Sequence, residues 1–356
     1  MQKKILNAVA ILWQTSLLIL VFNVFINPGL WIYLLRQAKG QLTVIAQTRD
    51  VTPLLQSSAL SEPQKNKIRL IQEVKLYAET RLGLKKTNNY STYLDHGKQP
   101  VIWLLTACEP FSLKEKTWTF PMLGEVSYKG FFDYNLGLKE ANELRVESFD
   151  VDLGRVSAWS TLGILSDPIL SSMLDDSEGE LAELIIHELT HATLYLPSSV
   201  DFNENFASFV GRKGAISFLE QKYGVQNDTL KSYLKNLEEE DTIKAFVLKH
   251  KQILAQFYNT LDDKLTVVQK NRLKADELNK IITALHLLPL SNKLKLKMAK
   301  RIVVSKNAFF MHYNRYDAQY EQLNQIFEQE GKLLPAFINS AKNNGFKRLI
   351  KDTDEH

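Results

Sequence analysis

The sequence has 356 residues, 45% of them hydrophobic and 24% charged, which is enough to bury the core of one large or two medium domains. Its 44 lysines and arginines against 40 aspartates and glutamates leave a net charge of +4, too small an excess to indicate a nucleic-acid partner. The single cysteine, Cys108, excludes an intramolecular disulfide and a cysteine-only metal site, and it follows an apolar run that predicts a buried, inert thiol. Any bound metal must therefore be held by histidine or carboxylate side chains.

The first patterned segment is apolar. Ile5–Ile26 runs for 22 residues without a charge, after lysines at positions 3 and 4. A helix of this length spans the roughly 30 Å hydrocarbon core of a bilayer. We expect residues 1–34 to be an uncleaved signal anchor, with the rest of the chain outside the cytoplasm. A cleaved signal peptide and a buried helix are the alternatives, and a lipoprotein anchor lacks its cysteine.

The remaining residues, 35–356, are predicted to form one domain, because no linker rich in proline, glycine or serine divides them. Apolar residues recur with a helical period between Pro63 and Leu82. Short apolar and alternating runs then indicate strands in a β-rich part, about 100–160. Helical patterns return at about 179–220 and continue through a C-terminal part at about 225–345. The predicted fold class is α+β and mostly helical, with a small β-sheet and a preceding N-terminal transmembrane helix.

The most informative stretch is His187-Glu188-Leu189-Thr190-His191. Two histidines four residues apart on a helix project from the same face, so both imidazoles can reach one ion. Glu188 lies beside them, where its carboxylate can act on a water molecule at the metal. The alternative is a pair of packed or capping histidines with a solvated glutamate. Because the helix is otherwise apolar, the three polar groups in its middle need binding partners. A single Zn²⁺ ion would be such a partner.

A hydrolytic zinc site needs a third protein ligand, and Glu204 is the candidate. It follows a short loop, near the start of a second helix that we expect Asp201 to cap, so that the two helices form a helix-loop-helix. The alternative is a capping box in which Glu204 only returns to the backbone N–H of Asp201. Ser208, one turn further along, is a candidate hydrogen-bond partner for a ligand histidine.

These residues carry a resemblance to known peptidases. His187-Glu188-x-x-His191 followed by Asn203-Glu204-x-Phe206-Ala207 resembles the gluzincin pattern, although the twelve residues between His191 and Glu204 are fewer than is usual there. The chain resembles more closely a family of bacterial envelope zinc metallopeptidases called putative aminopeptidases, over about residues 36–340. The phrases that carry this resemblance are Lys39–Leu42, Trp118–Gly124, Tyr128–Phe132, Ser160–Gly163, Asp167–Pro168, and Asn307–Ala308 with Tyr316.

The resemblance implies a zincin-like catalytic domain in which His187, His191 and Glu204 hold one zinc ion and Glu188 is the general base. It also implies a donor for the oxyanion of the tetrahedral intermediate. Tyr316 is the first candidate, with Tyr313 and His312 nearby.

Three further expectations concern a disulfide, the binding of the substrate amine and the pairing of the substrate with a strand. Members often carry a cysteine pair where this chain has Thr119 and Glu125, so that disulfide is absent here. An aminopeptidase also needs an anion for the free amine of its substrate, and Glu109 and Glu125 are candidates. The strand-like segment Val151–Trp159 is the expected edge for pairing with an extended peptide.

The expected function is hydrolysis of peptide bonds by a membrane-anchored zinc peptidase in the bacterial cell envelope, with an aminopeptidase preferred. The expected partners are a peptide or protein substrate and, through the N-terminal helix, the membrane. A zinc endopeptidase and a non-catalytic, zinc-stabilised scaffold are the alternatives. The intact Glu188 argues against the scaffold, because a structural zinc site needs no base.

Overall fold

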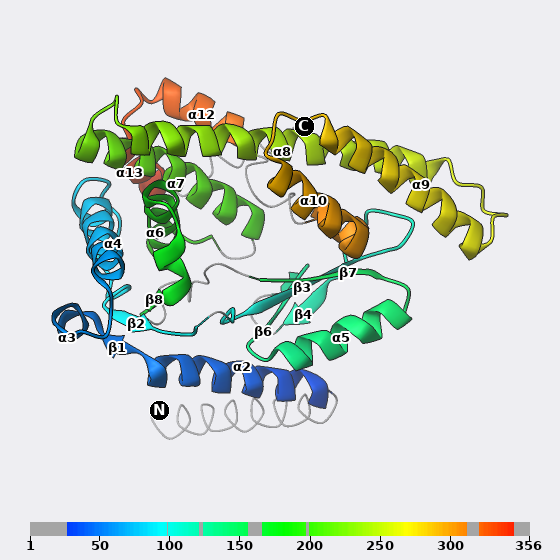
Figure 1. Ribbon diagram of the computed structural model, residues 1–356, viewed down its shortest axis with the longest axis horizontal. Coiled ribbons are helices and arrows are strands. Elements are labelled where there is room, and N and C mark those ends of the chain that lie inside the picture. Colours follow the sequence, from blue (N-terminus) through cyan, green and yellow to red (C-terminus); the bar gives the residue numbers. More distant parts are fainter. Residues whose placement is uncertain are drawn as a thin grey trace, which may run out of the picture. The chain divides into compact units, whose positions relative to one another are not determined.

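The computed structural model describes residues 27–97, 99–120, 124–155, 166–196, 199–311 and 320–344, without the side chains of residues 200, 201 and 344. By its contacts the chain divides into two compact units, Met1–Gln47 and Thr48–His356. Within the described residues the fold is α+β and mostly helical, with small sheets, which confirms that part of the predicted fold class (Figure 1).

The described part of the first unit is one helix, α2 (Pro28–Gln47). It has 20 residues, but Arg36 and Lys39 interrupt its apolar character, and Val44 is its buried residue. Among the helices that the structure describes, none combines the length and apolar character that a membrane crossing requires. The predicted fold class is therefore wrong in its N-terminal transmembrane helix. The segment Ile5–Ile26, on which that prediction depended, lies outside the described residues.

The second unit contains three small sheets. The central one has the order β6-β3-β7, with both pairs antiparallel. Another has the order β1-β2-β8, in which β2 and β8 are parallel, and the third is the hairpin-like pair β4 and β5. The strands are β1 (Arg49–Asp50), β2 (Thr92–Leu94), β3 (Trp103–Cys108), β4 (Trp118–Phe120), β5 (Gly124–Val126), β6 (Lys129–Phe131), β7 (Asp150–Arg155) and β8 (Ile169–Leu170).

Helices cover these sheets and form the rest of the unit. They are α3 (Val51–Gln56), α4 (Glu62–Thr80), α5 (Tyr134–Val146), the 3-10 helix η1 (Ser171–Asp175), α6 (Glu178–Thr193), α7 (Val200–Tyr223), α8 (Asp228–Asn259), α9 (Val267–His286), α10 (Asn292–Ser305), α11 (Asn307–Met311), α12 (Tyr320–Gln329) and α13 (Leu334–Asn344). The helix α6 packs mainly against α7 and α4, whereas α11 packs on β3 and β7.

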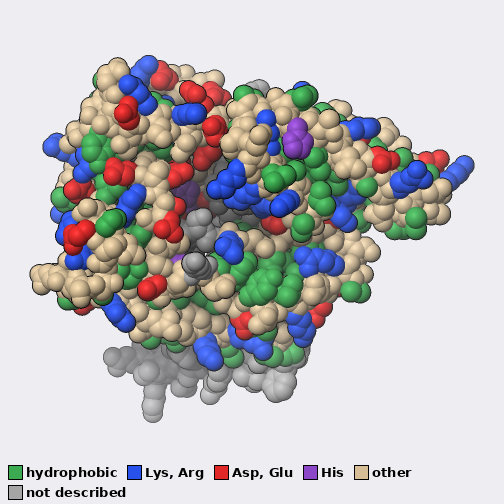
Figure 2. Space-filling view, in the orientation of Figure 1, with side chains coloured by type: hydrophobic (Ala, Val, Ile, Leu, Met, Phe, Trp, Pro, Cys, Tyr) green, Lys and Arg blue, Asp and Glu red, His purple; other side chains and the backbone are tan. Residues whose placement is uncertain are grey.

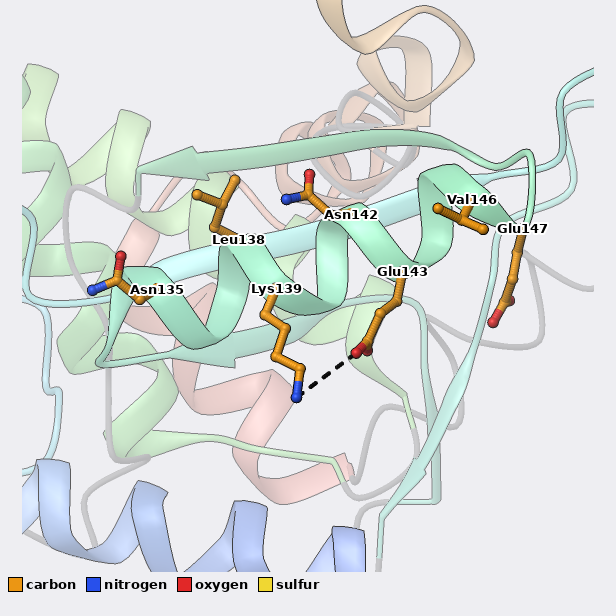
Figure 3. Close-up of a pocket in the computed structure, with 7 residues that line it drawn as sticks. All are labelled: Asn135, Leu138, Lys139, Asn142, Glu143, Val146 and Glu147. Atoms are coloured by element: carbon orange, nitrogen blue, oxygen red, sulfur yellow. Dashed lines mark ion pairs between the residues drawn. The ribbon is translucent and has the colours of Figure 1, made fainter.

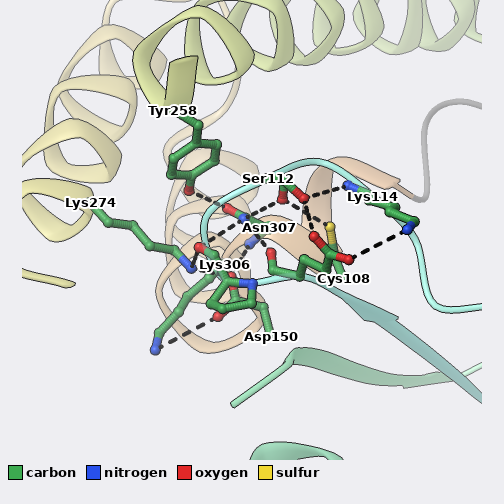
Figure 4. Close-up of polar contacts among 10 residues, drawn as sticks. Cys108, Ser112, Lys114, Asp150, Tyr258, Lys274, Lys306 and Asn307 are labelled. Atoms are coloured by element: carbon green, nitrogen blue, oxygen red, sulfur yellow. Dashed lines mark hydrogen bonds and ion pairs between the residues drawn. The ribbon is translucent and has the colours of Figure 1, made fainter. Parts of the chain in front are cut away.

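A buried polar cluster connects the C-terminal helices to the central sheet (Figure 4). Lys274 of α9 forms an ion pair with Asp150 of β7 and donates to the Pro110 carbonyl at 2.7 Å. The backbone N–H of Asn307 donates to Asp150 at 3.0 Å, and the Tyr258 hydroxyl donates to Asn307 at 2.7 Å. Each of these polar groups has a partner, so the cluster joins the elements without leaving a buried group unsatisfied.

Cys108, at the end of β3, lies in the hydrophobic core next to this cluster and is fully buried. Burial raises the pKa of its thiol to about 12, so the thiol stays protonated and unreactive at neutral pH. The predicted burial of the thiol is confirmed.

Candidate metal centre and active site

The helix α6 begins at a capping box. Ser177 accepts a hydrogen bond from the Glu180 N–H at 3.3 Å, and the Glu180 carboxylate accepts one from the Ser177 N–H at 2.9 Å. Leu181, Ile185 and Leu189 are fully buried, which fixes the rotation of the helix about its axis. This rotation places the two histidines, one turn apart, toward α7.

The helix α7 approaches α6 unusually closely at Gly211. A Cβ atom at this position would lie 3.1 Å from the Glu183 carbonyl oxygen and 3.3 Å from the Cβ of His187. Glycine therefore allows the two helices to pack closely beside the first histidine. This contact lies two turns along α7 from Glu204.

The start of α7 differs from the prediction. The helix begins at Val200 after the N-cap residue Ser199, so Asp201 lies inside the first turn and is not the cap. The buried side chain of Asn203 holds the preceding loop instead, since it accepts from the Leu196 N–H and donates to the Leu196 carbonyl, both at 2.8 Å. Asn203 belongs to the pattern that carries the resemblance, but no role was predicted for its side chain. Its position directly before Glu204 was the available signal.

Three ligand atoms converge where the two helices meet. The Nε2 atoms of His187 and His191 are 3.0 Å apart. The Glu204 carboxylate lies 3.5 Å from the first Nε2 atom and 3.6 Å from the second. Ligands at the usual zinc distance of about 2.0–2.1 Å lie roughly 3.3 Å from one another in a tetrahedral arrangement. The observed separations bracket this value, so the three residues fit a zinc ion, and the group is able to hold a metal.

The electrostatics of the centre also favour a cation. Burial disfavours the ionised Glu204 carboxylate, but hydrogen bonding to the two histidines outweighs burial and lowers its pKa well below the usual value. For His187, burial opposes protonation, yet Glu204 and the neighbouring glutamates raise its pKa overall. Two imidazole nitrogens that face each other at 3.0 Å cannot both be unprotonated acceptors without a cation or proton between them.

Glu188 lies beside these ligands and is 8% exposed. Burial raises the pKa of its carboxyl, while the two histidines act in the opposite direction. Its Oε2 atom and the Nδ1 atom of His191 are buried without a hydrogen-bond partner among the described residues. A carboxylate held in this way, next to a possible metal, is suited to exchange protons with a bound substrate or water molecule.

Ser208 stays a candidate supporting residue. Its Oγ atom is 3.5 Å from His187 Nδ1, which is long for a strong hydrogen bond. Glu183, one turn before His187, had no predicted role, although its charge contributes to the raised pKa of His187. It accepts from the Tyr233 hydroxyl at 2.7 Å and lies 3.5 Å from Arg212, which together hold it beside the centre.

The other predicted residues are not brought to the centre by any contact that the structure describes. Glu109 accepts from the Ser112 hydroxyl at 2.7 Å and lies 3.8 Å from Lys114. Glu125 is exposed on β5, directly opposite Thr119 of β4. Cross-strand neighbours of this kind are close enough for a disulfide, as the cysteine pair of the resembling family would require.

Three predicted candidates, Tyr316, Tyr313 and His312, lie outside the described residues, as do residues 156–163, which include the end of the predicted peptide-pairing segment Val151–Trp159.

A shallow cavity of about 690 Å³ lies elsewhere, along one face of α5 (Figure 3). Its lining residues all come from α5 and the residue that follows it, and none belongs to the metal group. Over the face drawn in Figure 2, acidic and basic side chains are interspersed, in keeping with the small net charge. Neither feature competes with the centre on α6 and α7 as the place for chemistry.

No curated protein and no solved structure matches the chain. The family model described as "Putative aminopeptidase" matches residues 32–352, which include both helices of the metal group and most of the chain. The chain therefore belongs to the putative aminopeptidase family.

Proposed function

We propose that the protein is a zinc-dependent peptidase that hydrolyses peptide bonds, with the free amino end of a peptide as its preferred site of attack. The observation that carries the proposal is the convergence of His187, His191 and Glu204 to within 3.0–3.6 Å of one another, with Glu188 beside them. Membership of the putative aminopeptidase family supports a peptidase and names the narrower activity.

His187, His191 and Glu204 would hold the ion, leaving a fourth position open to the reactants. A zinc ion bound in this way acidifies a water molecule and polarises the carbonyl of a peptide bond. The donor set supports zinc because two imidazoles and one carboxylate are the ligands of many catalytic zinc sites.

Glu188 moves the proton in this proposal. Its carboxylate accepts a proton from the attacking water and returns it to the amine that leaves. The burial that raises its pKa brings its basicity closer to neutral pH, where such an exchange is most effective. A non-catalytic zinc scaffold would place no buried base next to the ligands, so this residue favours an enzyme.

The deciding experiment combines metal content with turnover in wild type and Glu188→Gln. We expect about one zinc ion per chain in both proteins, and turnover of aminoacyl and internally quenched peptides that falls by about 100-fold or more in the variant. Glu220→Gln, an exposed change on α7, is the matched control and should behave as wild type. Full activity of Glu188→Gln, or wild-type protein that binds no metal, would contradict the proposal.

We also propose that the protein works in the bacterial cell envelope, outside the cytoplasm. The support comes from the sequence resemblance and from the uncharged stretch Ile5–Ile26. A C-terminal reporter enzyme that is active only after export tests this location. A reporter that is active only in the cytoplasm would refute it.

A further inference from the structure

Tyr90 is the most unusual residue near the candidate active site. It is 2% exposed and is among the largest fully buried side chains, yet it precedes β2 in a turn. Its backbone φ is +62°, a left-handed conformation that a bulky aromatic residue rarely adopts. Such a conformation persists only where the surrounding structure holds it, and it concentrates at functional sites.

Three hydrogen bonds hold this conformation. The Tyr90 N–H donates to the Asp167 carbonyl at 2.7 Å. The Asn89 side chain donates to the Asp167 carboxylate and accepts from the Asp167 N–H, both at 3.2 Å. Because Asn89 and Asp167 are themselves buried, these bonds are protected from water and fix the position of the tyrosine.

The loop that contains Tyr90, residues 85–91, is attached to the helix α6. At its start, the Lys85 N–H donates to the Thr193 hydroxyl of α6 at 2.9 Å. At its end, β2 pairs with β8, the strand that leads through η1 into α6. The loop therefore runs between two points connected to the helix that carries Glu188.

Three buried polar atoms near the candidate metal centre lack a hydrogen-bond partner among the described residues, namely the Tyr90 hydroxyl, the Oε2 atom of Glu188 and the Nδ1 atom of His191. The hydroxyl is a donor, and the carboxylate oxygen is an acceptor. Burial raises the pKa of the Tyr90 phenol, and the carboxylates of Glu188 and Asp167 raise it further, so the phenol keeps its proton at neutral pH.

We propose that the Tyr90 hydroxyl reaches the buried Glu188 oxygen through one enclosed water molecule, and that it thereby orients the carboxylate that accepts the proton. Tyr90 is thus a positioning residue for the proposed peptidase reaction, and this inference depends on the proposed function. A direct role as donor to the substrate is disfavoured, because the hydroxyl oxygen is enclosed.

Tyr90→Phe removes only the hydroxyl. We expect kcat to fall about 10- to 100-fold at unchanged KM, the loss that accompanies one hydrogen bond to a charged group. Tyr93→Phe removes a hydroxyl from another buried tyrosine in the same segment and should leave kcat unchanged. Asn89→Ala removes the two side-chain hydrogen bonds to Asp167 that hold Tyr90 in place, so we expect the same fall in kcat. This variant replaces Tyr90→Phe in the test if Tyr90→Phe folds poorly.

A second measurement does not depend on activity. In zinc-free protein, the urea midpoints of Tyr90→Phe, Glu188→Gln and the double variant should be non-additive if the two side chains are partners. Additive midpoints, or wild-type kcat in a folded Tyr90→Phe, would overturn the inference. Wild-type protein that turns over no peptide, together with non-additive midpoints, would instead refute the proposed function and leave the contact in place.

Discussion

Asp176 stands directly before the N-cap of α6, and its carboxyl group is partly withdrawn from water. Burial raises its pKa from 3.8 to about 6, with Glu180 and Asp175 adding to the rise and Lys67 opposing it. The folded protein therefore binds the extra proton between these two values, where the unfolded chain has already released it. Linkage then makes the free energy of unfolding fall as pH rises from about 4 to about 6.

Asp176→Asn should remove this pH-dependent penalty. At pH 7.5 we expect the free energy of unfolding to rise by about 1 kcal/mol, a value reduced for solvent screening of a partly exposed group. Near pH 4, where the native carboxyl is already protonated, the variant should match wild type. Urea denaturation at the two pH values measures this difference, with the exposed Asp263→Asn as control, since Asp263 does not contribute to the raised pKa of Asp176. A gain of equal size at both pH values would show that the charge of Asp176 is not its cause.

A residue of the centre is predictable from the sequence when its position depends only on neighbouring residues in the chain. The positions of His187, Glu188 and His191 depend on one helix, whose period fixes which side chains share a face. Glu204 depends in addition on where the next helix begins. The capping role expected of Asp201 was wrong because the helix begins at Val200, and Asn203 holds the preceding loop. A sequence pattern predicts the helix but not which side chain holds the loop that precedes it.

Tyr90 and Asp167 illustrate the opposite case. Their places depend on contacts 78 residues apart, between Asn89 and Asp167 in two loops. No periodicity or motif connects such segments, so only the folded chain brings them together. Glu109 and Glu125 were candidates because of their acidic character alone. That character could not show that Glu109 bonds to Ser112 or that Glu125 lies opposite Thr119.

At the scale of elements, the packing of α8 on α6 depends on a glycine. A Cβ atom at Gly179 would lie 2.4 Å from the Cγ of Tyr233 and 2.6 Å from its Cβ. Tyr233 is 2% exposed and bonded through its hydroxyl to Glu183, so its ring cannot move aside easily. Glycine thus allows the long helix α8 to reach the first turn of the metal helix.

Gly179→Ala should destabilise the protein by about 2 kcal/mol, because overpacking of the contact with Tyr233 exceeds the modest gain in helix propensity. Chemical denaturation measures the change. Gly29→Ala is the matched control, since Gly29 is also the second residue of a helix but has open space around it, and it should change stability by less than about 0.5 kcal/mol. Unchanged or increased stability in Gly179→Ala would show that the two helices can separate without loss.

Periodic patterns identified several elements well. The helical period between Pro63 and Leu82 corresponds to α4, which spans Glu62–Thr80. Strand pairing was not predictable in the same way. The antiparallel register that places Cys108 opposite Asp150 depends on a connection through the β4–β5 pair, β6 and α5, which no local pattern encodes.

At the scale of the whole molecule, the unit Thr48–His356 is held together by contacts between distant segments. Lys274 and Asp150 are 124 residues apart in sequence, and their side chains are only 3% and 5% exposed. Neither residue stood out in the sequence, because a lysine on a lysine-rich helix is normally solvated. The pair matters to the metal centre because α6, α7 and the C-terminal helices belong to the same compact unit.

Lys274→Met keeps most of the side-chain volume but leaves Asp150 buried, with the Asn307 N–H at 3.0 Å and Lys306 at 4.0 Å as its remaining partners. We expect a loss of about 3–5 kcal/mol in the free energy of unfolding, the usual effect of removing one member of a buried ion pair. If the unit unfolds as one, circular dichroism and retention of zinc should report the same lowered midpoint.

Lys280→Met is the matched control on the same helix. Lys280 is 74% exposed and pairs with Glu277 at 2.8 Å, so its loss should change the free energy of unfolding by less than about 1 kcal/mol. The double variant Lys274→Met/Asp150→Asn should recover part of the loss, because the neutral amide still accepts from Asn307 and no longer buries a charge. Stability within about 1 kcal/mol of wild type in Lys274→Met would mean that Asp150 finds another partner. Separate midpoints for the two probes would mean that the C-terminal helices and the metal centre unfold independently.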